Sequence, residues 1–505
     1  MLNFLVLILI IAAVAIFTYV SGNPLGHSAA YRRRRILNWV PLGIGYAFLY
    51  FGRYNLTVAK NNLGNELMSK SEFGTIFAVG TVLYAFAFIL NGPLTDRIGG
   101  RKAMLISTIG AAFANIALGA FVFLLGPATA AHHGTAAYLR SAEGHSLLFA
   151  LFIALYAINM YFQSFGAVSI VKVNSAWFHV RERGVFGGIF GILISAGIFF
   201  AFDFGQWFVD TFHKVTDAAG KTVMNPPFAV FWAPGVLLLL AALWIYLKVF
   251  DRPGLAGFQD FDTGDASSGE DQKPDSVVVV LKKVVMNPIV LTIGAIEFCT
   301  GVLRQGVMHW YSIYGKEMHY DSSFFVTQHW GLMMFLAGAT GGMTAGWISD
   351  KVFNSRRGPV AALLYGIMII AVVLMSIFVE EPQQGAAYSM TSMWVMGACV
   401  VFISYCVIGT HGMLSGTATQ DFGGTKNAGT AVGLIDGLVY LGTAVQSWSL
   451  GQITEKVSWR WWPPFLIPFA IIGTLLAIRI WHALPDAARK GAPVKREPLA
   501  AGRGR

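Results

Sequence analysis

Two arginines lie inside long apolar stretches of the chain, Arg53 and Arg304. An arginine at the centre of a membrane-spanning helix costs about 2.5 to 3.5 kcal/mol, so it is kept there for a partner or a ligand. Arg53 follows the end of a basic cluster at Arg35 by eighteen residues, and Arg304 follows Asn287 by seventeen. These similar intervals predict that the two arginines reach a similar depth in separate parts of the fold.

Two converging guanidinium groups would form a fork for a doubly charged oxyanion, since their planar donors suit phosphate geometry. The alternative is that each arginine is buried in an ion pair with an acid on another helix. The candidate acids are Glu297, Asp203 and Asp436. Glu297 precedes Arg304 by seven residues, two helical turns, which is too far for a direct bond within one helix.

Other polar residues accompany the arginines. Tyr46, Tyr50 and Arg53 stand at i, i+4 and i+7, on one stripe of a helix. The tyrosines would donate hydrogen bonds to an oxyanion or a sugar hydroxyl, or serve as core aromatics with satisfied hydroxyls. Asp436 lies about eight residues inside an apolar segment. Its candidate roles are proton coupling, contact with a substrate, and pairing with Arg304 when the site is empty.

Two loops repeat an acidic and basic pattern. The first runs from Gly92 through Asp96, Arg97, Arg101 and Lys102, and the second from Gly346 through Asp350 and Lys351. Each has a glycine that permits close helix packing, then an acid four residues later, then a basic turn, as a closing salt-bridge latch requires. A charged loop that only fixes topology is the plainer interpretation. Two copies in equivalent loops favour the latch.

The elements that hold these residues follow from composition. Of 505 residues, 55% are hydrophobic and only 12% charged, which excludes a soluble enzyme. We therefore predict an all-α integral membrane protein. Its twelve spans are expected near 36–59, 71–95, 102–127, 146–171, 184–211, 227–249, 287–314, 325–349, 359–379, 390–416, 428–453 and 461–483. Trp459, Trp461 and Trp462 are expected to anchor the last span at the membrane surface.

These spans fall into two groups of six. The predicted domains are residues 31–250, an aqueous linker at 251–286, residues 287–484 and a basic tail at 485–505. Most of the net charge of +10 falls in alternate loops, which predicts that both ends of the twelve-span unit and the C-terminus are cytoplasmic. The charge is therefore a topology signal, and we expect no nucleic-acid partner.

Residues 1–30 contain a thirteenth apolar run, 2–20, with no basic residue before it apart from the chain terminus. A secretory signal peptide would have a positive start. We therefore expect an extra uncleaved helix with its N-terminus outside. A cleaved leader or a misassigned start codon is the alternative.

Specific motifs resemble those of the major facilitator superfamily and, within it, the organophosphate:phosphate antiporters. The resemblance covers about 36–484 and rests on the two latches, Gly45 to Arg53, Arg181 to Gly184, Asp251 to Pro253, Leu303 to Gly306 with Trp310, and Ala428 to Ala431. It implies a fold of two pseudo-symmetric six-helix halves. It also implies that the residues matching Arg53 and Arg304 bind phosphate and that Tyr46 and Tyr50 lie near the site.

The chain departs from this family at three positions near the expected site. Phe88 stands where a lysine is usual, Ile194 where a histidine is usual, and His309 where glycerol-phosphate members have an acid. The resemblance thus implies an oxyanion substrate without specifying which organophosphate.

These observations predict an inner-membrane antiporter, working as a monomer, that exchanges an organophosphate for inorganic phosphate by alternating access. Two alternatives remain, a proton-coupled symporter of another organic anion in which Asp436 carries the proton, and a transporter-like receptor. No nucleotide motif or nucleophile constellation supports an enzyme, and we expect neither a cofactor nor a metal site.

Overall fold

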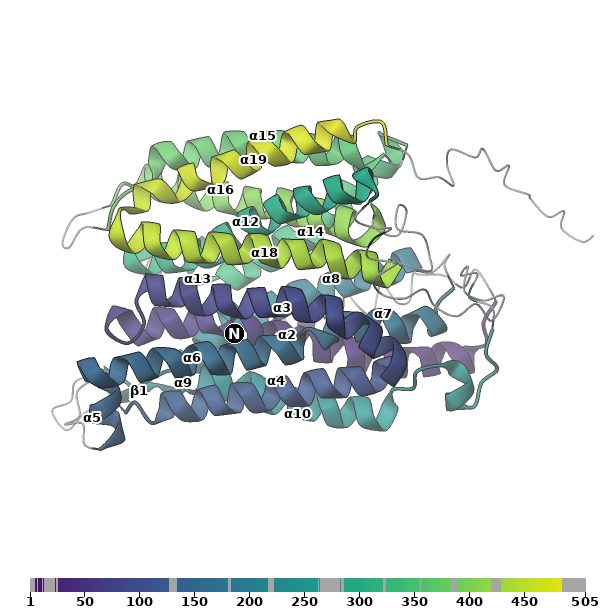
Figure 1. Cartoon of the computed structure of the whole chain (residues 1–505), viewed down its shortest axis with the longest axis horizontal. Helices are drawn as coiled ribbons and strands as arrows, with labels where there is room; N and C mark the ends of the chain where they lie inside the picture. Colours follow the sequence, from purple (N-terminus) through teal and green to yellow (C-terminus); the bar gives the residue numbers. More distant parts are fainter. Residues whose placement is uncertain are drawn as a thin grey trace, which may run out of the picture.

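The computed structural model describes residues 5–6, 8–10, 12, 23, 26–126, 134–179, 183–216, 222–261, 263, 282, 286–320, 324–354, 356–382, 388–418 and 428–483. Helices dominate these residues, and the predicted membrane-spanning plan is confirmed. Ten stretches of helix in the described part of the chain are long and apolar enough to cross a membrane. The N-terminal half and the C-terminal half lie side by side (Figure 1).

The N-terminal half contains the first six predicted spans. Its elements are α2 (Ala29–Leu67), α3 (Lys70–Ile98), α4 (Gly100–Phe123), α5 (Thr135–Arg140), α6 (Ala142–Gln163), α7 (Phe165–Trp177), α8 (Arg183–Phe199), the π-helical η2 (Phe200–Phe204), α9 (Gly205–Phe212), β1 (Lys214–Thr216), β2 (Thr222–Met224) and α10 (Ala229–Lys248). The fourth span is divided at Ser164, and the fifth continues through η2. The antiparallel hairpin of β1 and β2 pairs Lys214 with Met224 and was not predicted.

The C-terminal half contains the other six spans. After η3 (Pro253–Ala256), its elements are α12 (Pro288–Glu317), α13 (Phe325–Gln328), α14 (Trp330–Lys351), α15 (Arg357–Phe378), α16 (Met390–His411), the π-helical η5 (Gly412–Ala418), α18 (Ala428–Lys456), η7 (Trp459–Trp461) and α19 (Trp462–Arg479). Local chemistry sets the helix starts. Asn287 caps α12, whose first residue is proline, and Ser69 and Glu72 form a capping box on α3.

The halves meet along α3 with α18 and along α8 with α14, and α2 also contacts α12. Figure 1 shows α18 and α3 at this boundary. Glycine permits the closest approach, because a Cβ on Gly74 would lie 2.3 Å from the carbonyl oxygen of Ser447. A side chain at Gly74 would therefore force the halves apart.

The polarity of α2 and α18 reflects their central position. These two helices are absent from the ten strongly apolar stretches in the described residues. Arg53, Asn55 and Thr57 are buried on α2, and Thr443 and Gln446 on α18. Polar side chains inside a membrane bundle face its interior, so these helices line the centre.

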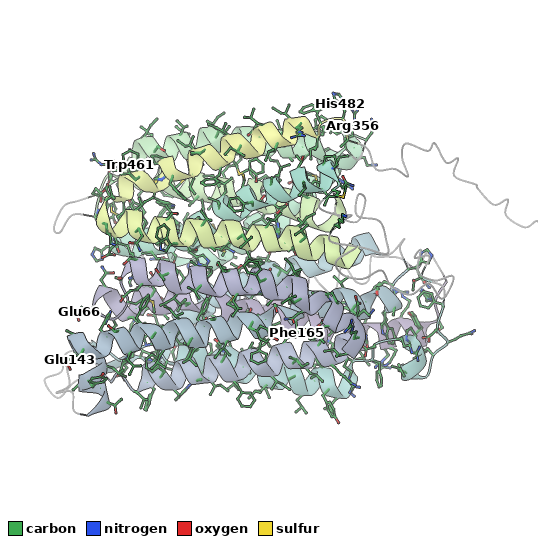
Figure 2. The ribbon with its side chains drawn as sticks, viewed as in Figure 1. Glu66, Glu143, Phe165, Arg356, Trp461 and His482 are labelled. Atoms are coloured by element: carbon green, nitrogen blue, oxygen red, sulfur yellow. The ribbon has the colours of Figure 1, made fainter. Side chains whose placement is uncertain are left out.

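Glu66, Glu143 and Trp461 lie at one end of the bundle, and Arg356 and His482 lie at the other (Figure 2). We call the first the Lys70 end and the second the Asp96 end, after residues near the two ends of α3. Of the expected anchoring tryptophans, only Trp461 is exposed, whereas Trp459 and Trp462 are buried. The anchoring prediction was wrong for those two, because their indole nitrogens bond Glu317 and the Gly306 carbonyl.

The N-terminal run packs against the N-terminal half. Among residues 2–20, the described ones are helical, and Val6 and Ile10 are buried against Ala196 and Phe199. Whether that run spans the membrane stays a prediction. Most of the linker, 264–281, and the tail from 484 onward lie outside the described residues. The predicted domain boundaries there stay predictions.

Candidate substrate-binding site

Arg53 lies in the second half of α2 and has no exposed surface. Its Nε donates to Gln163 Oε1 at 2.8 Å, and its Nη2 donates to the Tyr84 hydroxyl at 3.3 Å. Nη1 donates to the hydroxyl of Tyr440, which belongs to the other half. The guanidinium also lies over the rings of Tyr50 and Tyr84, at 4.6 and 4.7 Å from their centroids. Arg53 is thus held in a fixed orientation by both halves.

Side-chain amides on neighbouring helices hold Gln163 through hydrogen bonds. Gln163 Nε2 donates to Asn159 Oδ1 at 3.0 Å, as does Asn115 Nδ2. Asn159 Nδ2 donates to the Gly52 carbonyl at 2.8 Å, next to Arg53, and the Tyr156 hydroxyl donates to the Arg53 carbonyl at 3.0 Å. A buried polar network in which these donors find acceptors is rigid. The surroundings of Arg53 are therefore ordered by the protein itself.

Arg304 has a different setting on α12. Its exposed fraction is 8%, against 0% for Arg53. Its Nε has no hydrogen-bond partner, and the described residues provide no ion pair to its guanidinium. Burying an unpaired charge is costly, so this arrangement is typical of a group that waits for a ligand.

The alternative of a buried ion pair fails for all three candidate acids. Glu297 Oε2 lies 2.7 Å from His411 Nδ1. Asp203 accepts from the backbone amides of Gly331 and Leu332, at the start of α14. Asp436 accepts from Ser415 Oγ at 2.6 Å. None of these acids pairs with Arg304, although Glu297 and Asp436 interact with it electrostatically.

The structure brings the two arginines to one cluster of tyrosines. Tyr50, Tyr54 and Tyr440 lie close to both guanidinium groups. The Tyr54 hydroxyl also accepts from Gln305, the neighbour of Arg304, at 2.9 Å. Tyr50 continues the cluster to Tyr46, whose ring centroid lies 5.2 Å away. The predicted stripe of Tyr46, Tyr50 and Arg53 is therefore present at the centre.

The three departures from the family have clear places in this structure. Phe88 is buried and stacks on Tyr84 at 5.5 Å. Ile194 is half-buried and packs against the core. His309 is buried, with Nδ1 2.6 Å from Thr57 Oγ1 in the other half. His309 thus joins the halves, and the other two fill apolar space.

Sequence reasoning missed the partners of Arg53, namely Gln163, Tyr84 and Tyr440. One available signal was polar spacing in an apolar segment, because Asn159 and Gln163 stand at i and i+4 and so share a helix face. Tyr440 and Arg53 are 387 positions apart in the sequence. No local pattern links them.

The first predicted latch has partners in the N-terminal half and at the start of the linker. Asp96 Oδ1 lies 2.7 Å from Lys172 Nζ, and the Arg101 amide donates to Asp251 at 2.7 Å. The Arg101 guanidinium donates to the Tyr246 carbonyl, while Arg97 and Lys102 are exposed. These contacts join the Asp96 end of α3 to α7, α10 and the start of the linker.

The second predicted latch lies only partly within the described residues. Lys351 is exposed, and Arg357 donates to Ser349 Oγ at 2.9 Å. The Asp350 side chain lies outside the described residues. A Cβ on Gly92 or Gly346 would meet no atom of the described chain within 4 Å. The expected close packing at these two glycines is therefore absent in this arrangement, and the latch function stays a prediction.

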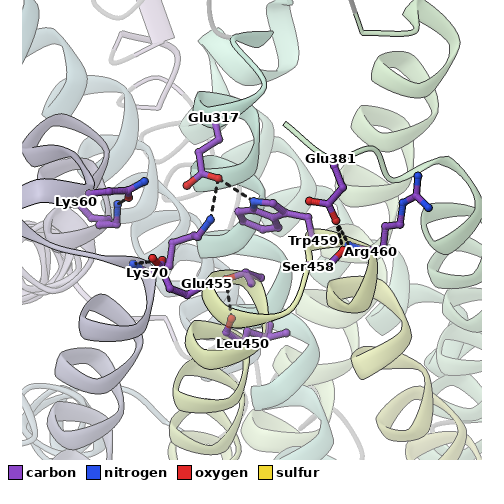
Figure 3. A network of polar contacts seen from close by, with 11 residues as sticks. Lys60, Lys70, Glu317, Glu381, Leu450, Glu455, Ser458, Trp459 and Arg460 are labelled. Carbon is purple, nitrogen blue, oxygen red and sulfur yellow. Dashed lines mark hydrogen bonds and ion pairs between the residues drawn. The ribbon is translucent and has the colours of Figure 1, made fainter. Parts of the chain in front are cut away.

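The Lys70 end is closed by contacts between the halves (Figure 3). Lys70 Nζ lies 3.0 Å from Glu317 Oε2, and the Lys70 amide donates to Glu455 at 3.1 Å. Trp459 Nε1 donates to the same Glu317 oxygen at 2.8 Å, and the Lys70 ammonium lies 5.1 Å from the Trp459 ring. We call Lys70, Glu317, Glu455 and Trp459 the end network. On another seam, Asp203 joins η2 to α14.

No group of three or more metal-ligating side chains occurs within the described residues. His145 Nε2 lies 2.6 Å from Glu72 Oε1.

The fold and the paired arginines define a membrane transport protein built of two six-helix halves. A family model described as Major Facilitator Superfamily matches residues 42–447, and the chain belongs to this superfamily. Membership of this superfamily and relatives named as transporters confirm the prediction that the chain is not an enzyme.

Individual relatives support the resemblance to the organophosphate:phosphate antiporter family. The chain is 25% identical to the membrane sensor protein UhpC of Escherichia coli, covering 85% of this chain and 88% of that one. It is 24% identical to the glycerol-3-phosphate transporter of Bacillus subtilis (90% and 94% covered). It is 21% identical to a probable hexose phosphate transport protein of Chlamydia muridarum (91% and 94%).

Solved structures support the fold. A bacterial homologue of the human lysosomal transporter Spinster, in an inward-facing and unoccupied conformation, has a TM-score of 0.61 at 15% identity, covering 90% of this chain and 98% of that one. A D-xylose-proton symporter has a TM-score of 0.58 at 12% identity, with 88% and 97% covered.

Proposed function

We propose that this chain is a secondary transporter that exchanges a phosphorylated organic anion for inorganic phosphate by alternating access. The observation that carries the proposal is Arg304, a buried guanidinium without a hydrogen bond or ion pair in the described residues, at the tyrosine cluster that also surrounds Arg53. A phosphoryl group would supply the missing negative charge. Relatives named as glycerol-3-phosphate and hexose phosphate transporters support this substrate class.

The residues have distinct proposed roles. Arg304 and Arg53 grip the phosphoryl oxygens, since a guanidinium donates two parallel hydrogen bonds. Tyr50 and Tyr46 donate to the phosphoryl group or to hydroxyls of the organic part. Phe88 and Ile194 replace polar residues of the resembled family, so the organic part meets a less polar wall here.

The proposed orientation places the Asp96 end in the cytoplasm, because positive loops stay on that side. Its exposed basic side chains include Arg97, Lys102 and Lys351. We propose that the protein is a monomer of the inner membrane with a cytoplasmic C-terminus. The end network then closes the outer side, and the latches at Asp96 and Asp350 close the inner side in the opposite state.

The test is exchange in proteoliposomes loaded with inorganic phosphate and offered labelled glycerol-3-phosphate and glucose-6-phosphate outside. We expect uptake that depends on internal phosphate and is lost in Arg304→Ala. The matched control is Arg479→Ala, which removes an exposed arginine at the end of α19. Exchange that persists in Arg304→Ala would contradict the proposed site. Uptake driven by a pH gradient without internal phosphate would favour symport.

A second candidate function is ligand sensing, because relatives at 25% and 26% identity are named membrane sensor proteins. A sensor would bind phosphate compounds through the same arginines without transporting them. Binding to purified protein together with no exchange in the proteoliposomes would favour that function.

A further inference from the structure

A buried acid and an imidazole lie close together on the side of Arg304. Glu297 on α12 has no exposed surface, and its Oε2 lies 2.7 Å from Nδ1 of His411 on α16. Its other oxygen, Oε1, has no hydrogen-bond partner. The His411 side chain is 21% exposed. The pair thus combines a sealed carboxylate with an imidazole that reaches solvent.

The titratable and charged groups around this pair come from three helices. They are Cys299 and Arg304 on α12, Tyr365 on α15 and Asp436 on α18. With Glu297 and Asp436 ionised, His411 neutral and Arg304 positive, this cluster carries a net charge of −1. One added proton makes it neutral.

We propose that the Glu297–His411 pair is a proton-binding site coupled to the anion bound at Arg304, an inference that rests on the proposed function. Without the proton, neutral His411 donates its Nδ1 hydrogen to the Glu297 carboxylate. The incoming proton binds the exposed Nε2, and the resulting imidazolium stays paired with the carboxylate. No other bond changes, and the proton leaves by the same nitrogen.

The coupling follows from charge and distance. Seven residues of helix separate Glu297 from Arg304, a rise of about 10 Å. One elementary charge at that distance in a partly polar interior changes the affinity for an anion by roughly tenfold. Coupling is reciprocal, so a bound phosphate must raise the proton affinity of the pair by the same factor. The anion affinity of such an exchanger therefore depends on pH.

The experiment measures how many protons the purified protein takes up when inorganic phosphate binds, by calorimetry at pH 6 to 8 in buffers of different ionisation enthalpy. Phosphate itself exchanges protons in this range, but that contribution is the same for every variant. We expect Glu297→Gln and His411→Gln to take up fewer protons than the wild type when phosphate binds. Both variants should also lose the roughly tenfold gain in phosphate affinity that the wild type shows at acid pH. Glu297→Gln keeps the shape of the side chain, and His411→Gln leaves Glu297 in place, so either folded variant suffices.

Glu72→Gln is the matched control, because Glu72 forms a histidine–glutamate pair with His145 at the Lys70 end. This variant should behave like the wild type. If the wild type binds no phosphate, the proposed function fails and this inference with it. If the wild type binds phosphate and Glu297→Gln takes up as many protons, only this inference is overturned. Loss of the extra protons in Asp436→Asn alone would also overturn it and assign the proton to Asp436.

Discussion

The two halves of the bundle hold corresponding arginines in opposite conditions. Arg53 in the N-terminal half donates to Gln163, Tyr84 and Tyr440 and has no exposed surface. Arg304 in the C-terminal half has an unpartnered Nε and remains 8% exposed. Symmetry of position therefore does not give symmetry of environment. Arg53 is oriented by hydrogen bonds within the protein, whereas Arg304 has donors left over, which under the proposed function are available to the ligand.

The largest expected effect tests this difference through stability. Arg53→Met leaves the polar atoms of Gln163, Tyr84 and Tyr440 buried without their donor, and we expect it to lower the free energy of unfolding by about 2 to 4 kcal/mol. Arg304→Met removes a buried charge that has no partner, and we expect it to raise the stability of the empty protein by about 1 kcal/mol. Thermal or denaturant unfolding in one detergent measures both. Equal losses in the two variants would contradict the assigned roles.

The two arginines could be found in the sequence, but their hydrogen-bond partners could not. A charge within an apolar run is visible in one dimension, so Arg53, Arg304 and the stripe from Tyr46 were predictable, as were the helical spans. Whether a buried donor finds an acceptor depends on residues distant in sequence. Arg53 donates to Gln163, which is 110 positions away, and to Tyr440. The same reason hid the pairing of Glu297 with His411, 114 positions away.

A smaller effect is expected at the bond between the halves. Tyr440 accepts from Arg53 Nη1, a donor that a phosphoryl oxygen would also need under the proposed function. We expect Tyr440→Phe to tighten the binding of inorganic phosphate by roughly tenfold, since a neutral hydroxyl on a charged donor contributes about 1.5 kcal/mol or more. Calorimetric titration of the purified variant measures the change.

The control for that variant is Tyr84→Phe, whose hydroxyl bonds Arg53 at 3.3 Å from within the same half. A longer bond should give a smaller gain in affinity. Weaker binding in Tyr440→Phe would mean that Tyr440 contacts the bound anion instead of competing with it, and Arg53 would then be less scaffold-like than its bonds indicate.

The smallest expected effect concerns how the halves separate. Lys70 and Glu317 have side chains that are 10% and 21% exposed, so their ion pair is partly desolvated and should contribute on the order of 1 kcal/mol to the closed Lys70 end. Lys70→Met should therefore raise the population open at that end several-fold. Spin labels at Glu66→Cys and Trp461→Cys, on exposed positions in different halves at this end (Figure 2), report the distance distribution.

The control is Lys214→Met, which removes a lysine that pairs with Asp210 inside the N-terminal half at 3.2 Å. That pair does not cross the boundary, so the label distances should stay those of the wild type. The three native cysteines are buried and should not take up label. If Lys70→Met leaves the distances unchanged, the halves are held at this end by apolar packing and by the Asp203 contact with α14. In that case the opening that admits an anion to Arg304 would be controlled from the seam between η2 and α14 and not from the end network.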